Sequence, residues 1–133
     1  MTDDQTREIL RRYHTIAVVG LSPKPERASY QVAQYLQDHG YRIVPVYPRA
    51  GKILGETVYL RLEDIPFPVD IVDVFRKAED TPAVAESAVR IGAKVLWLQL
   101  GIASEVARSI AETGGLSVIE DRCMKIEHER LLV

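Results

Sequence analysis

Short, largely apolar runs alternate along the chain with longer segments in which apolar residues recur at helical spacing. A run that is apolar at almost every position is typical of a parallel strand with both faces covered. The pattern predicts five such strands, at Ile16–Val19, Tyr41–Tyr47, Val69–Phe75, Ala93–Leu98 and Leu116–Ile119.

Helices are predicted before, between and after these strands. They cover residues 4–12, 28–39, 103–113 and 122–131, together with a segment that begins at Thr81 and stops at Gly92. Thr81 is expected to cap that segment, because threonine caps helices well and Pro82 suits the first helical position. The glycine- and proline-rich stretch 48–68 is predicted to form turns, with one turn of helix near residues 62–64.

The alternation of strands and helices predicts an α/β fold in one domain over residues 1–133. Right-handed crossovers then give a doubly wound, five-stranded parallel sheet with helices on both faces. We expect the strand order 3-2-1-4-5. The switch point of that sheet lies beside the first strand, and ligands bind there at the carboxyl ends of the strands.

Composition excludes several classes of partner. The net charge is −2 with acidic and basic residues interspersed, so the chain has no broad basic surface for nucleic acid. No apolar run reaches the roughly 20 residues that cross a bilayer. A single cysteine fits a reducing compartment. We therefore expect a cytoplasmic protein that binds neither nucleic acid nor a membrane.

The turn after the first strand carries the most informative chemistry. Gly20 ends the strand, and the next glycine is Gly40, so the G-x-G-x-x-G pattern of dinucleotide sites is missing. A helix N-terminus at this turn offers free N–H groups to a phosphate. Side chains in the turn are predicted to add to that binding; they are Ser22, Lys24, Arg27 and Ser29.

The end of the second strand indicates which nucleotide is bound. Dinucleotide sites for NAD place an acidic residue there, but positions 40–50 contain none, and Pro48-Arg49 follows the strand. An arginine suits a phosphorylated ribose, as in NADP or coenzyme A. The glycine-poor first turn favours coenzyme A over NADP, and both stay open on these grounds.

Six segments resemble the small stand-alone CoA-binding proteins that are related to the N-terminal domain of the succinyl-CoA synthetase α subunit. They are Ala17–Ser22, Arg27–Tyr30, Gly40–Val46, Val69–Arg76, Trp97–Gly101 and Asp121–Cys123. The resemblance runs from about residue 10 to residue 130. It implies a Rossmann-like fold that binds coenzyme A (CoA) or an acyl-CoA.

The resemblance also implies roles for individual residues. Gly20, Ser22, Arg27 and Ser29 would hold the diphosphate, and Pro48 and Arg49 would flank the phosphorylated adenosine. Val74, Phe75 and Arg76 would wall the adenine side, and Gln99 to Gly101 the pantetheine side. The family tends to have asparagine where this chain has Tyr47, so ring stacking replaces a hydrogen bond in our interpretation of that position.

The resemblance implies binding and does not by itself imply turnover. We expect no catalytic residues, and a homo-oligomer or a protein partner is possible. Cys123 is interpreted as structural, because His128 lies five residues further on and a helix would not bring it over the thiol. Two alternatives stay open: an NADP-dependent oxidoreductase, and the CoA-binding subunit of an acyl-CoA ligase completed in trans.

Overall fold

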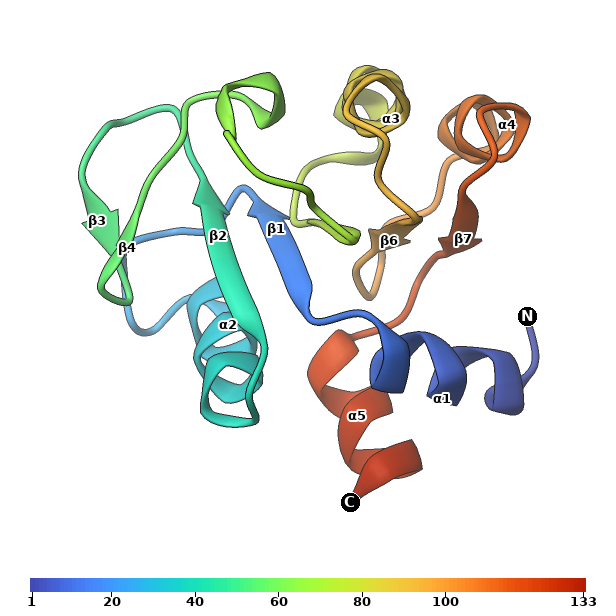
Figure 1. Ribbon diagram of the computed structural model, residues 1–133, viewed down its shortest axis with the longest axis horizontal. Helices are drawn as coiled ribbons and strands as arrows, with labels where there is room; N and C mark the ends of the chain where they lie inside the picture. Colours follow the sequence, from blue (N-terminus) through green and yellow to red (C-terminus); the bar gives the residue numbers. More distant parts are fainter.

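The computed structural model describes residues 1–133 as a five-stranded parallel sheet with helices on both faces (Figure 1). The strands are β1 (Thr15–Val19), β2 (Arg42–Val46), β5 (Ile71–Val74), β6 (Val95–Leu98) and β7 (Ser117–Ile119). All four neighbouring pairs are parallel. The α/β prediction and its five parallel strands are confirmed.

The helices divide between the two faces of the sheet (Figure 1). One face is covered by α1 (Asp3–Arg12), α2 (Ala28–Asp38) and α5 (Met124–Leu132). The other is covered by α3 (Thr81–Arg90) and α4 (Glu105–Thr113). Alternate strand residues point to opposite faces, so Val18 packs in the first core and Val19 in the second. No helix has the length and apolar character needed to cross a membrane.

The predicted strand order 3-2-1-4-5 is wrong. The observed order is β2-β1-β5-β6-β7, so the third large strand lies on the far side of β1 and β2 is left at the edge. Pro45 explains this placement: its carbonyl accepts from Tyr59 N–H on the side away from β1. Because proline has no N–H, a strand that contains it is suited to an edge. The switch point still lies beside β1, between β1 and β5.

A short hairpin that the sequence did not predict lies beyond this edge (Figure 1). It pairs β3 (Lys52–Ile53) with β4 (Glu56–Thr57) in antiparallel fashion. The two loop residues, Leu54 and Gly55, both have positive φ, as two-residue hairpin loops require. Such loops are recognised in a sequence by Asn-Gly or Asp-Gly. This loop has leucine at its first position, so it lacks that signal.

The connections on either side of β5 contain short 3-10 helices. The first, η1 (Leu62–Asp64), confirms the predicted turn of helix. The second, η2 (Ala78–Asp80), leads directly into α3, so the N-cap is Asp80 and it makes no side-chain cap bond. The prediction that Thr81 caps α3 is therefore wrong. Its hydroxyl is already inside the helix and donates to the carbonyl of Ala78 over 2.6 Å.

Candidate functional site

The backbone at Gly20 packs directly against the end of β5. Its N–H donates to the carbonyl of Val46, and its φ is +85°. A Cβ at this position would lie 2.5 Å from the carbonyl oxygen of Phe75. Glycine is therefore required here for the close approach of two strand ends as well as for the positive φ.

Hydroxyl groups shape the turn that leads into α2. Ser29 Oγ accepts a hydrogen bond from Ser22 N–H over 3.0 Å, and Ser22 Oγ accepts one from Lys24 N–H over 3.1 Å. Arg27 is the N-cap of α2 and makes no side-chain cap bond, and the first helical turn contains no acidic residue. The free N–H groups and positive dipole end of α2 thus face the turn and favour an anion.

These groups line a hollow of about 360 Å³, which we call the turn hollow. Its eight lining residues are Gly20, Ser22, Lys24, Arg27, Ala28, Ser29, Tyr47 and Phe75. Six of them were predicted as site residues from the sequence. Lys24 and Arg27 take part in none of the ion pairs of the structure, and no acidic side chain lines the hollow. The turn hollow is suited to a phosphate or diphosphate.

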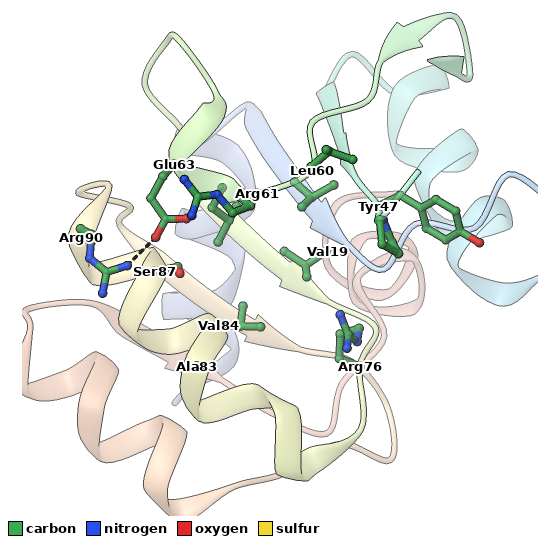
Figure 2. A pocket seen from close by; sticks show the side chains of 13 residues that line it. Val19, Tyr47, Leu60, Arg61, Glu63, Arg76, Ala83, Val84, Ser87 and Arg90 are labelled. Atoms are coloured by element: carbon green, nitrogen blue, oxygen red, sulfur yellow. Dashed lines mark hydrogen bonds and ion pairs between the residues drawn. The ribbon is translucent and has the colours of Figure 1, made fainter. Parts of the chain in front are cut away.

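A second hollow of about 340 Å³, the α3 groove, opens on the other face of the sheet (Figure 2). It is lined by Val19, Val46, Tyr47, Pro48, Leu60, Arg61, Leu62, Glu63, Arg76, Ala83, Val84, Ser87 and Arg90. Tyr47 lines both hollows, and Figure 2 shows its ring turned away from the rest of the groove. Tyr47 is the one residue that the two linings share.

The polar groups of the α3 groove stand at its two ends (Figure 2). At the end where Tyr47 stands, Figure 2 also shows Arg76, whose guanidinium pairs with Asp80 at 3.2 Å. At the other end Arg90 donates to Glu63 over 2.5 Å.

The carboxylate of Glu63 stays ionised. Burial acts to raise its pKa, but hydrogen bonds from Ser87, from its own backbone and from Arg90 outweigh that effect and lower the pKa. Arg61 is the least constrained cation of the groove, since it is 71% exposed and stands 3.8 Å from Asp64. Arg61, Glu63 and Arg90 were not predicted as site residues. The first two lie in a turn-rich stretch and the third on a helix, and no sequence motif links the two segments.

Four other predicted site residues line neither hollow. Arg49 is exposed beside Pro48, and the side chain of Val74 is fully buried in the core. Gln99 is only 3% exposed and donates to Asp73. Gly101 is exposed, with its N–H bound to Asp121. Their roles toward a ligand stay predictions.

Cys123 and His128 lie in separate surroundings. Cys123 is half-buried at the N-cap of α5. His128 is buried, and its Nδ1 lies 2.8 Å from the hydroxyl of Tyr35 on α2. Burial, and then the charge of His39, lower the pKa of His128. The histidine links α2 to α5 and lines neither hollow.

Known proteins share both the sequence and the fold of this chain. The chain is 43% identical over 124 residues to the uncharacterized protein YneT of Bacillus subtilis, which covers 93% of this chain and 92% of YneT. A solved hypothetical protein from Pyrococcus horikoshii superposes with a TM-score of 0.97 at 44% identity, covering 100% of this chain and 94% of that one.

A larger protein matches part of the chain. The α subunit of acetate–CoA ligase (ADP-forming) I from Pyrococcus furiosus is 32% identical over 95 residues, which are 67% of this chain but only 21% of that subunit. The family described as CoA binding domain matches residues 14–129. The expected relationship is thus confirmed: the chain belongs to the CoA binding domain family and is related to the α subunit of an acetate–CoA ligase.

Proposed function

We propose that this protein binds CoA or an acyl-CoA at the carboxyl ends of β1, β2 and β5 and catalyses no reaction by itself. The observation that supports this most strongly is the turn hollow. It combines an uncapped helix N-terminus with two cations that have no ion-pair partner. A site of this kind is suited to the diphosphate of a nucleotide.

The diphosphate would lie against the first turn of α2. Arg27 and Lys24 would neutralise its charge, and backbone N–H groups at the start of α2 would donate to its oxygens. The main role of Ser29 is to hold the turn in shape, because its oxygen already accepts a hydrogen bond from Ser22 N–H. Its hydroxyl proton remains free to donate to a phosphate oxygen.

The adenosine would pass Tyr47 into the α3 groove. Tyr47 and Pro48 line the entrance, and Val19, Val46 and Val84 supply apolar walls for a flat base. The phosphate on the 3′ carbon would then lie near the end of β2, within reach of Arg49, which is exposed at that point. This placement retains the roles that the family resemblance implies for Pro48, Arg49 and Arg76.

The side chains that line the two hollows limit the chemistry that the protein could carry out on a bound ligand. Neither hollow is lined by Cys123 or by a histidine. A second candidate function is that of a CoA-binding subunit completed in trans, which the similarity to the acetate–CoA ligase α subunit favours. Such a subunit would co-purify with a partner that supplies the missing chemistry.

A calorimetric titration of the ligand-stripped protein with CoA, dephospho-CoA, NADP and NAD tests the proposal. We expect micromolar binding of CoA, weaker binding of dephospho-CoA and no heat with either nicotinamide nucleotide. Tight NADP binding without a CoA signal would replace the proposal with the oxidoreductase alternative. The absence of a binding signal with all four ligands would refute the proposal.

A further inference from the structure

The end of the α3 groove furthest from Tyr47 carries a fixed carboxylate that the proposed CoA contacts do not use (Figure 2). Glu63 comes from η1, and its partner Arg90 comes from α3, so two separate elements hold it in place. The side chain of Glu63 is 24% exposed, which leaves it accessible from the groove. It is the only acidic residue that lines the groove.

The carboxylate has acceptor capacity left. An ionised carboxylate offers about four lone-pair sites. In the structure one hydrogen bond reaches it, from Arg90 to Oε2 over 2.5 Å. A donor inside the groove can therefore still bind to Glu63, whereas an acceptor placed there would be repelled.

The groove also matches the order of groups in an adenine nucleotide. From Tyr47, the turn hollow holds cations for phosphates, the middle of the groove is apolar, and the far end is polar (Figure 2). A 6-aminopurine base stacked against Val19 and Val84 would direct its exocyclic amine toward that far end.

We infer that Glu63 selects a 6-aminopurine by accepting a hydrogen bond from its exocyclic amine. This inference rests on the proposed function for placing the phosphates in the turn hollow. Hypoxanthine and guanine present a carbonyl oxygen at the same ring position, and that oxygen would face the carboxylate of Glu63. The groove would therefore bind adenine nucleotides more tightly than inosine nucleotides.

Titrations of the protein with ADP and with IDP test the preference for a 6-aminopurine. Two-dimensional NMR spectra recorded during each titration give the two dissociation constants. The two ligands differ at the 6-position, and we expect ADP to bind about tenfold more tightly than IDP. In Glu63→Gln the carboxamide can donate as well as accept, so the ratio is expected to fall toward one. The matched control is Glu86→Gln, an exposed position of α3 that does not line the groove and should keep the wild-type ratio.

The outcomes separate this inference from the proposed function. If CoA binds but ADP and IDP bind equally, or if Glu63→Gln keeps the full preference, the base-selecting role is refuted and CoA binding stands. If CoA does not bind but the ADP preference appears and depends on Glu63, the role of Glu63 stands and the CoA proposal is refuted. If no nucleotide binds, both are refuted. The ADP to IDP ratio of the wild-type protein needs no variant to fold.

Discussion

Asp73 and Gln99 form a buried pair where β5 and β6 approach their carboxyl ends. Gln99 Nε2 donates to Asp73 Oδ1 over 2.5 Å, while Asp73 Oδ2 has no hydrogen-bond partner. The Asp73 side chain is fully buried beside Val18 of β1 and Trp97 of β6. Burial raises the pKa of Asp73 to about 7, and the bond from Gln99 only partly offsets that rise.

The raised pKa predicts that Asp73 destabilises the protein as pH increases. The carboxyl is protonated in both folded and unfolded chains well below pH 3.8, its ordinary pKa. Above that pH the unfolded chain ionises first, so the free energy of unfolding falls until the folded carboxyl also ionises near pH 7. The full cost, on the order of 4 kcal/mol, is present above pH 7.

Urea denaturation of Asp73→Asn at pH 5 and pH 8 checks this. Relative to the variant, the wild-type protein should lose about 3 kcal/mol of stability between the two pH values. The lowered pKa of His128 affects stability with the opposite sign, but His128 is present in both proteins and its effect cancels in the difference. Asp38→Asn, at an exposed position, is the control. Parallel pH profiles for the wild-type protein and Asp73→Asn would contradict the account.

Substitution of Gly20 should cost more than its backbone conformation alone explains. Gly20 and Gly101 share a φ of +85°, but a Cβ meets Phe75 at the first position and nothing within 4 Å at the second. Gly101→Ala should lose about 1 kcal/mol through strain. Gly20→Ala should lose a further 1–3 kcal/mol, roughly, through the clash. Thermal melts of both variants measure the two losses of stability. Equal losses would show that the close approach of Phe75 adds no cost at Gly20.

Ser29→Ala should weaken both the fold and the site. The substitution leaves the Ser22 N–H without its acceptor in a part-buried turn, which costs about 1–2 kcal/mol of stability. Because that bond shapes the turn hollow, CoA affinity should fall as well. Ser109→Ala, on the exposed side of α4, is expected to change neither quantity. If Ser29→Ala kept the stability and the CoA affinity of the wild-type protein, the proposed role of Ser29 in shaping the turn would be refuted.

Arg27→Ala should weaken CoA and dephospho-CoA by the same factor. The arginine is proposed to contact the diphosphate, which both ligands carry, and a charge-assisted hydrogen bond contributes about 1.5–3 kcal/mol. Arg49→Ala should instead reduce only the preference for CoA over dephospho-CoA. Arg11→Ala is the control, because Arg11 is exposed on α1 and lines neither hollow. Calorimetry on the three variants distinguishes these roles, and a loss confined to CoA in Arg27→Ala would contradict the assignment.

Most of the fold could be predicted because each strand is a nearly unbroken apolar run. Such runs fix which segments are buried on both faces, but they do not fix which strand lies beside which. Pro45 was the one local signal of the order, since a strand interrupted on one side by proline is suited to the edge. The hairpin around Leu54 was missed because its loop has no asparagine or aspartate at the first position.

The candidate site was predictable only where it is local in sequence. The turn from Gly20 to Ser29 is a single segment, and the residues singled out there line one hollow. The α3 groove gathers Arg61, Glu63 and Arg90 from two elements that meet only in the folded chain. Gln99 was predicted as a site residue because it follows a strand. The sequence pattern could not show that its side-chain amide donates a hydrogen bond to Asp73.

A crystal structure of the protein with bound CoA tests the central claim most directly. We predict that the diphosphate lies at the N-terminus of α2, within hydrogen-bond distance of Arg27, with the adenosine beyond Tyr47 in the α3 groove. CoA bound elsewhere on the molecule, or a complex in which the turn hollow holds no phosphate, would contradict the account.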